Sequence, residues 1–123
     1  MKYVFLIILT YCSYFFSKNE TRIGVNKFHQ EQTDTLTVFG NCKMCKRRIE
    51  GSILGYVGVT ATEWNIETKI LTITYHPFEN SLEEIQKIII ESGHDTRRYT
   101  AQDSIYNQLP VCCKYRKNKL NEK

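Results

Sequence analysis

The sequence predicts an α+β fold in which two helices cover one face of a four-stranded antiparallel sheet, followed by a C-terminal extension. Three observations support this expectation. Some segments alternate polar and apolar residues, as strands do, and others repeat apolar residues every three or four positions, as helices do. The two kinds of segment follow one another in the order β-α-β-β-α-β. The length of 123 residues leaves room for one such domain and short extensions.

The first strand is expected at residues 35–39, where polar and apolar side chains alternate before a glycine. The first helix is expected at residues 45–54. There, Cys45, Ile49 and Ile53 recur at a spacing of four and form one apolar stripe. This stripe predicts the face of the helix that packs against the sheet.

The next two segments predict a β-hairpin. Residues 59–64 and 69–75 both alternate and are rich in β-branched and aromatic residues. Pro77 ends the second strand, because proline has no N–H to donate to a neighbouring strand.

The second helix is expected to begin at a capping box, in which Ser81 and Glu84 exchange hydrogen bonds with each other's backbone. Gly93 provides the left-handed residue that ends many helices. Residues 95–99 can then form a last strand. The complete order is that of the ferredoxin-like βαββαβ sandwich.

Two thiols stand between the first strand and the first helix, in the motif Cys42-Lys43-Met44-Cys45. A CxxC pair at such a turn either binds one soft cation or forms a redox disulfide. The positive end of the helix dipole favours the thiolate form of a cysteine placed there. The motif therefore predicts thiolate chemistry at this end of the domain.

With its CxxC motif between the first strand and the first helix, the segment 34–99 resembles the heavy-metal-associated domain, the family of bacterial copper chaperones. The resemblance implies that Cys42 and Cys45 bind Cu(I) or another soft ion, and that the partner is a metal-transporting ATPase or efflux component. The methionine that usually precedes the first cysteine in this family is missing. Met44 lies inside the motif instead, where its thioether either approaches the metal or fills space in the core.

His94 falls in the loop before the last expected strand, where bacterial copper chaperones often carry a tyrosine. The resemblance places this loop beside the metal loop. An imidazole there is either a third ligand or gate, or a partly exposed side chain that shields the site.

A second pair of thiols, Cys112-Cys113, lies in the extension 100–123, beyond the usual end of the family. About twelve residues separate this pair from Tyr99 and can span roughly 40 Å, so the pair can return to the metal end. We expect it to join a multi-thiolate site. The alternative is a disulfide. If the N-terminal apolar segment that carries Cys12 is a signal peptide and is removed, four cysteines remain, and an even number of cysteines in an exported chain often indicates disulfides.

The N-terminal part predicts export. Residues 1–17 contain an uncharged apolar run that is typical of a signal peptide or membrane anchor, and residues 18–33 form a polar linker. Cys12 is either discarded with the apolar run or lipid-modified. We therefore expect a periplasmic or otherwise extracytoplasmic protein, with a membrane tether through this segment as an option.

Charge and motifs exclude several classes of function. The net charge is +4, and the basic residues fall in separate clusters at 46–48, 97–98 and 114–119 rather than along one face, which argues against nucleic-acid binding. The chain has no phosphate-binding glycine loop, serine triad or pair of hydrolytic carboxylates, so we expect no enzyme.

The leading hypothesis is a carrier of a soft metal ion, with Cu(I) as the first expectation and Hg(II), Zn(II) and Cd(II) as the other ions that thiolates accept. Two alternatives stay open: a thiol-disulfide redox protein that uses the same CxxC pair, and a structural zinc module that binds a partner protein.

Overall fold

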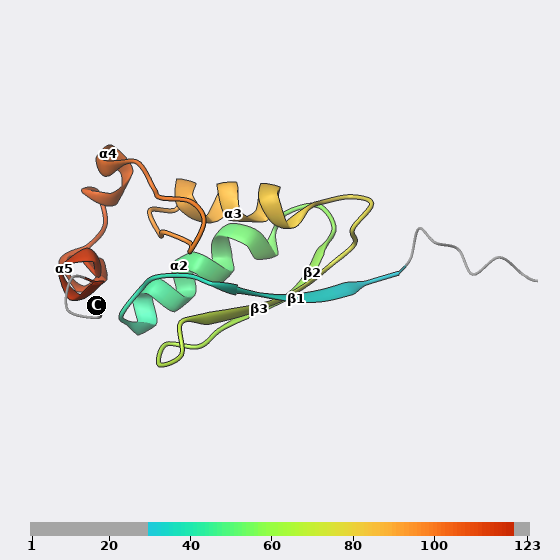
Figure 1. Cartoon of the computed structure of the whole chain (residues 1–123), viewed down its shortest axis with the longest axis horizontal. Coiled ribbons are helices and arrows are strands. Elements are labelled where there is room, and N and C mark those ends of the chain that lie inside the picture. The colour runs from blue at the N-terminus through green and yellow to red at the C-terminus, as the bar shows by residue number, and fades with distance from the viewer. Residues whose placement is uncertain (1–29, 120–123) are drawn as a thin grey trace, which may run out of the picture.

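The computed structural model of the protein describes residues 30–119, in which two helices lie on one face of a three-stranded antiparallel sheet (Figure 1). The strands are β1 (Gln32–Thr37), β2 (Val59–Trp64) and β3 (Ile70–Tyr75), in the spatial order β1-β3-β2. The long helices are α2 (Lys43–Leu54) and α3 (Leu82–Glu91). The extension forms α4 (Asp103–Tyr106), the 3-10 turn η3 (Val111–Cys113) and α5 (Arg116–Lys119).

The hairpin and both long helices are confirmed. Strand β2 pairs with β3 from Val59 opposite Tyr75 to Trp64 opposite Leu71, with one irregularity between Val59 and Ala61. The capping box is present at the start of α3, and Gly93 follows the end of that helix with φ +92°. The local signals for these elements are strong because each combines periodicity with a turn or cap residue.

The prediction of a fourth strand at 95–99 is wrong, because the chain makes only one isolated bridge there, between Val38 and Thr96. Two backbone hydrogen bonds next to the bridge join Phe39 to Asp95 and Arg97 to Thr37. The Thr96 hydroxyl then accepts hydrogen bonds from the backbone N–H groups of residues 98 and 99, which turns the chain away. The sheet therefore keeps only the first contact of the fourth strand.

The first strand also differs from the expectation, because it begins at Gln32 and includes the end of the expected linker. Polar cross-strand pairs extend it. The Tyr75 hydroxyl donates to the Asp34 carboxylate at 2.8 Å, and the hydroxyls of Thr33 and Thr74 lie 3.0 Å apart. The hydropathy pattern does not show that residues 32–34 belong to the strand, since polar contacts with β3 stabilise this part of β1.

The core lies between the sheet and the two long helices. The fully buried Trp64 occupies its centre, and its indole N–H donates to the Val38 carbonyl at 3.0 Å. The other buried apolar side chains come from both helices and β3, namely Ile49, Ile53, Leu71, Ile73, Ile85 and Ile89. This core continues into the extension through buried residues that include Tyr106, Leu109 and Tyr115.

The extension lies at the end of the domain where β1 passes into α2 (Figure 1), and η3 contacts α2 there. Within residues 30–119, no helix is long and apolar enough to cross a membrane. The apolar run expected to form a signal peptide or anchor lies outside the described residues, as does Cys12.

Candidate metal centre

The CxxC pair is held by the first turn of α2. Cys42 is the N-cap residue, and its sulfur accepts a hydrogen bond from the backbone N–H of Cys45 at 3.4 Å. The two Sγ atoms lie 3.3 Å apart. On the other side, the Cys45 thiol donates to the Asn41 side-chain oxygen at 3.4 Å. The helix start thus brings both sulfurs to one point and aims its positive end at them.

The loop before the motif is pressed against the core at Gly40. A Cβ atom at this position would lie 2.9 Å from the Trp64 ring and 3.0 Å from the Cys45 Cβ, so only glycine fits. Glu50 accepts hydrogen bonds from the Trp64 backbone N–H and from the Lys46 ammonium, each at 2.7 Å. These contacts hold the first half of α2 against the end of β2. They thereby help to fix the loop that precedes α2.

The C-terminal thiols meet the CxxC pair. The Sγ atom of Cys113 lies 3.6 Å from that of Cys42, and the Sγ atoms of Cys112 and Cys113 are 3.9 Å apart. The sulfur atoms of Cys42, Cys112 and Cys113 all lie within 4.8 Å of one another. All four cysteines within residues 30–119 are free thiols. The structure therefore brings together four of the five residues expected at the site.

This sulfur cluster fits a thiophilic ion. Metal–sulfur bonds are about 2.3 Å long in zinc sites, so two sulfurs on one ion lie at most about 4.6 Å apart. The observed separations between neighbouring sulfurs are all shorter. Cys45 and Cys113 are fully buried, whereas Cys42 is partly exposed and Cys112 is exposed. The cluster consequently has an inner side that retains an ion and an outer side that solvent and partners reach.

The thiols differ in acidity. Burial by itself would raise the pKa of Cys42, but hydrogen bonds from the Cys45 backbone and from the Cys45 and Cys113 thiols outweigh it and lower the pKa to about 7. Burial raises the pKa of Cys45 and of Cys113 above the ordinary value. Cys42 is therefore the thiol that carries negative charge near neutral pH.

His94 is fully buried rather than partly exposed, and it contacts the loop before the CxxC motif and the extension. Its ring stacks on Tyr115, with centroids 5.4 Å apart, and its Nδ1 lies 3.0 Å from the Phe39 carbonyl oxygen. Burial lowers the pKa of His94, so the ring is neutral, and Nδ1 carries the proton because a carbonyl can only accept. Nε2 is buried without a hydrogen-bond partner. Direct ligation by His94 stays a prediction.

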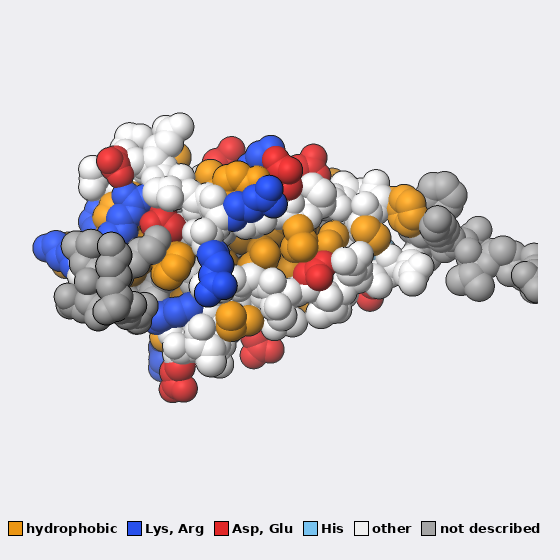
Figure 2. Space-filling view, viewed as in Figure 1, with side chains coloured by type: hydrophobic (Ala, Val, Ile, Leu, Met, Phe, Trp, Pro, Cys, Tyr) orange, Lys and Arg blue, Asp and Glu red, His pale blue; other side chains and the backbone are white. Residues whose placement is uncertain are grey.

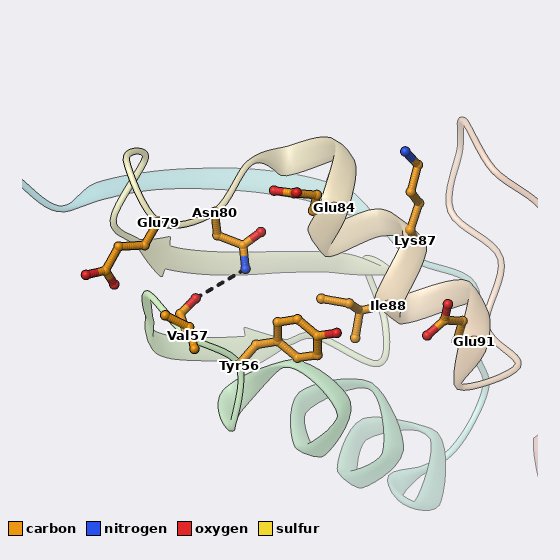
Figure 3. A pocket seen from close by; sticks show the side chains of 8 residues that line it. All are labelled: Tyr56, Val57, Glu79, Asn80, Glu84, Lys87, Ile88 and Glu91. Atoms are coloured by element: carbon orange, nitrogen blue, oxygen red, sulfur yellow. Dashed lines mark hydrogen bonds between the residues drawn. The ribbon is translucent and has the colours of Figure 1, made fainter.

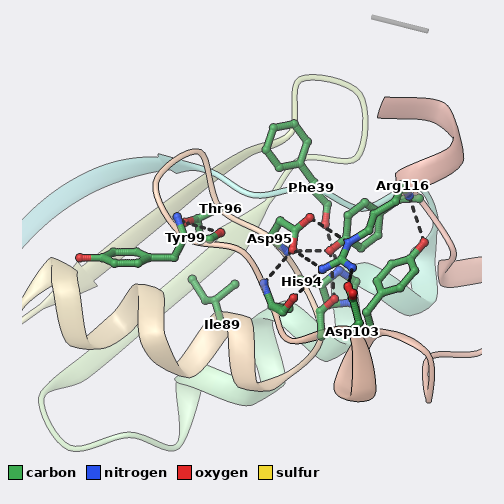
Figure 4. A network of polar contacts seen from close by, with 12 residues as sticks. Phe39, Ile89, His94, Asp95, Thr96, Tyr99, Asp103 and Arg116 are labelled. Carbon is green, nitrogen blue, oxygen red and sulfur yellow. Dashed lines mark hydrogen bonds and ion pairs between the residues drawn. The ribbon is translucent and has the colours of Figure 1, made fainter. Parts of the chain in front are cut away.

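A buried ion pair fastens the extension to the domain (Figure 4). The Arg116 guanidinium donates to both carboxylate oxygens of Asp95, at 2.9 and 3.2 Å, and to Asp103 at 2.6 Å. The Tyr115 hydroxyl accepts from the Asp95 backbone N–H at 2.7 Å and donates to the Gly93 carbonyl at 3.0 Å. We call these contacts of Asp95, Tyr115 and Arg116 the clasp, and they hold the segment that carries Cys113.

Sequence reasoning missed the clasp because it placed Arg116 in a basic tail. The charge of Arg116 is in fact matched by two carboxylates, and its guanidinium stacks over the Tyr106 ring at 4.0 Å. The apolar residues Tyr106 and Leu109, spaced by three, are the signal in the sequence that the extension packs.

The basic run at 46–48 serves two purposes. Lys46 is engaged, since its ammonium donates to Glu50 and to the Trp64 carbonyl. Arg47 and Arg48 are exposed on α2, next to the thiols. Within residues 46–48, the two arginines are therefore the exposed cations.

A hollow of about 280 Å³ lies away from the thiols, between the α2–β2 loop and α3 (Figure 3). Its lining includes Glu84, which already caps α3, and Lys87, which pairs with Glu83 at 2.9 Å. No cysteine or histidine lines it. The hollow thus offers no thiol or imidazole to a soft ion, and the thiol cluster is the better candidate site.

Solved structures show what the chain is similar to. The oxidized MerP from Ralstonia metallidurans CH34 is 25% identical, with a TM-score of 0.52, over 55% of this chain and 94% of that protein. The N-terminal domain of a potential copper-translocating P-type ATPase from Bacillus subtilis, in the Cu(I)-loaded state, is 25% identical with a TM-score of 0.53, over 62% and 96%. The CopZ metallochaperone shares the fold at 24% identity and a TM-score of 0.51, over 53% and 98%.

No family model matches the sequence, and no curated protein sequence is significantly similar to it. The similarity therefore rests on the fold, and it covers little more than half of the chain. The solved structures span the domain, whereas this chain adds an extension whose thiols reach the same point as the CxxC pair.

Proposed function

Because the chain has the fold of heavy-metal-associated domains, we propose that it is a non-catalytic carrier that binds Cu(I) and transfers it by thiolate exchange. Cys42 and Cys45 are the principal ligands, and Cys112 and Cys113 complete the site. The observation that carries this proposal is the 3.6 Å approach of Cys113 to Cys42, which adds thiols from the distant C-terminus to the CxxC pair.

Transfer proceeds from the exposed side of the cluster. A thiolate of the acceptor binds the ion first, beside Cys42 or Cys112, which are the accessible thiols. The accessible ligands leave next, and the buried Cys45 and Cys113 release the ion last. Each step exchanges one metal–sulfur bond for another, so the ion is never free in solution. A site with more thiolates holds its ion more tightly and releases it more slowly.

The donors favour a soft ion. Sulfur supplies every donor that we assign, and thiolates and thioethers are ligands that suit Cu(I). Hg(II), Cd(II) and Zn(II) also accept thiolates. Purification of the protein from cells under reducing, anaerobic conditions, followed by elemental analysis, identifies the ion, and a preparation that contains zinc alone would contradict the choice of Cu(I).

The partner that suits this site has an acidic surface around its own thiols, as a domain of a metal-transporting ATPase or efflux component would. Arg47 and Arg48 are exposed next to the CxxC motif. On the face of the molecule that Figure 2 shows, Lys and Arg side chains gather on the half nearer to the extension. Positive charge there would attract an acidic surface and accelerate the encounter.

Export is part of the proposal and depends on the sequence alone. The apolar run within residues 1–17 supports it. Cell fractionation of the full chain, with mass spectrometry of its N-terminus, is the test. Recovery of the protein only in the cytosol with this run intact would contradict export without affecting metal binding.

The central experiment titrates the reduced protein with Cu(I) against a competing chelator. Cys42→Ser/Cys45→Ser is expected to lose Cu(I) retention, because both principal ligands are removed. We expect the fold to survive in this variant, since most of the core consists of apolar side chains other than Cys45, from both helices and the sheet.

Val111→Ala is the control, because this side chain next to the C-terminal thiols is 89% exposed and has no sulfur. It should retain Cu(I) as the unmodified chain does. Circular dichroism verifies that all variants are folded. Equal Cu(I) retention by the folded double variant would refute the proposed function.

A thiol-disulfide redox protein is the second candidate, favoured by the pKa of about 7 at Cys42 beside the less acidic Cys45. In that reaction the Cys42 thiolate attacks a disulfide and releases one thiol, and Cys45 then displaces the second thiol to leave a Cys42–Cys45 disulfide. Reduction of a model disulfide substrate is the test. Rapid turnover by a chain that retains no Cu(I) in the chelator titration would support this function over metal transfer.

A further inference from the structure

The sulfur atoms at the metal centre form a continuous row that includes a methionine. Successive separations are 3.3 Å from Cys45 to Cys42, 3.6 Å from Cys42 to Cys113 and 3.9 Å from Cys113 to Cys112. The row ends at the thioether of Met44, whose Sδ lies 3.8 Å from the Cys112 Sγ. Five soft donors exceed what one Cu(I) accepts, since this ion binds two to four ligands.

The position of Met44 suits a metal ligand better than a side chain that fills space in the core. It lies in the first turn of α2 between the two cysteines of the motif, and it is 36% exposed. A methionine that fills the core is buried. Here the side chain extends over η3 and contacts the exposed Cys112. The 3.8 Å separation is within the limit of about 4.6 Å for two sulfurs on one ion.

We infer that the centre binds two soft ions, one at Cys42 and Cys45 and a second at Cys112 and Met44, with Cys113 shared between them. This inference depends on the proposed function and adds to it the capacity of the site and the role of Met44. The shared ligand, Cys113, is the middle member of the row, 3.6 Å from Cys42 and 3.9 Å from Cys112.

Charge permits the second ion. With Cys112 protonated, three thiolates around one Cu(I) carry a net charge of −2, and four thiolates around two Cu(I) carry the same −2, so the second ion adds no net charge to the cluster. Cys45 and Cys113 are fully buried, so uncompensated charge at them is costly. The second ion releases one proton, from Cys112, because Cys113 is already deprotonated by the first ion and a thioether has no proton to lose.

The exposed position of the second site gives it a distinct property. Cys112 and Met44 are both accessible, whereas Cys45 and Cys113 are buried. An ion at the second site is therefore expected to bind more weakly and to leave first. The centre would load and unload in sequence, with the outer ion exchanging before the inner one.

Native mass spectrometry of the reduced full chain, titrated anaerobically with Cu(I) buffered by a chelator, tests the inference. The unmodified monomer is expected to bind two ions in two resolved steps. Met44→Leu removes the thioether at nearly constant volume and should weaken the second step at least tenfold, leaving the first unchanged. Cys112→Ser should have a larger effect on the same step.

Val111→Ala is the matched control, because this neighbouring side chain is 89% exposed and has no sulfur. It should retain both steps. Cys113→Ser tests the shared ligand and should weaken both steps.

A monomer that saturates at one ion with high affinity would overturn the inference and leave the proposed function standing. A Met44→Leu variant with both steps unchanged would also overturn it. A Cys113→Ser variant that weakens only one step would overturn the shared position of that thiol. Failure of the unmodified chain to bind any Cu(I) would refute the proposed function together with the inference.

Discussion

The two pairs of thiols reach the same point by different means. Cys42 and Cys45 are held by contacts within a few residues, namely the N-cap hydrogen bond and the Asn41 side chain. Cys112 and Cys113 belong to a short 3-10 turn, and their position depends on the clasp, in which Tyr115 and Arg116 contact residues about twenty positions earlier.

This difference predicts different stabilities. The CxxC loop moves only if α2 and its buried stripe of Cys45, Ile49 and Ile53 move as well. The extension can detach when the clasp opens, without disruption of the sheet, because local openings cost less than global unfolding. The CxxC ligands thus belong to the core of the domain, and the C-terminal ligands belong to a segment that can open separately.

The largest expected effect comes from breaking the clasp. Arg116→Ala removes the guanidinium from the buried Asp95 carboxylate, and we expect unfolding to become easier by about 3 kcal/mol, as for other ion pairs whose carboxylate is buried. Urea unfolding measures this change. Cu(I) bound through the CxxC pair should persist, whereas the contribution of Cys113 should be lost.

Lys87→Ala is the control, since it breaks an ion pair with Glu83 that is exposed on both sides. We expect no measurable change from it. Equal stability of the two variants would show that the clasp does not hold the extension.

The next effect concerns the CxxC side of the comparison. Gly40→Ala would place a methyl group 2.9 Å from the Trp64 ring and 3.0 Å from Cys45, and such overpacking is expected to cost about 2 kcal/mol. Gly51→Ala is the matched control in α2, where nothing lies within 4 Å, and it should stabilise the protein by about 1 kcal/mol. Thermal unfolding with Cu(I) titration of both variants is the measurement, and a Gly40→Ala variant as stable as Gly51→Ala would contradict the close packing of this loop.

Removal of the C-terminal thiols should open the site without unfolding it. Cys112→Ser/Cys113→Ser is expected to bind Cu(I) about tenfold more weakly and to transfer it faster to an acceptor thiol, because fewer thiolates hold the ion. Stopped-flow transfer and chelator competition, both under reducing conditions, measure the two quantities. If neither changes, the pair is not part of the site.

The smallest effect distinguishes the two regions by acidity. With a pKa of about 7, Cys42 should be alkylated about fivefold faster at pH 7 than at pH 6, following its thiolate fraction. Burial raises the pKa of Cys113, so its rate should stay low until well above pH 9. Substoichiometric labelling of the metal-free protein, read by peptide mass spectrometry, tests this order. Equal rates for the two thiols at pH 7 would contradict it.

Much of the domain could be predicted from its sequence because the signals are local. The stripe at Cys45, Ile49 and Ile53 predicts the buried face of α2, and the capping box at Ser81 and Glu84 predicts the start of α3. The CxxC pair falls at the helix N-terminus that these signals define. Neighbouring residues decide these features, so a pattern of a few positions is sufficient.

The fourth strand and the clasp could not be predicted in this way. Residues 95–99 would complete the expected βαββαβ order as a strand, but the Thr96 hydroxyl turns the chain after a single bridge. Arg116 looks like part of a solvated tail, yet it pairs with the buried Asp95. Each outcome depends on a contact whose partner the local pattern does not indicate.

The sequence alone determined the order of the elements, the CxxC motif at a helix start and the presence of a second thiol pair within reach. Only the tertiary structure decided that this pair lies against the motif, with Cys113 3.6 Å from Cys42 and Met44 beside Cys112. The physical reason is the range of the interactions. Periodicity and caps act over one or two turns, whereas a buried charge at Asp95 selects its partner from the whole chain by the cost of leaving it uncompensated.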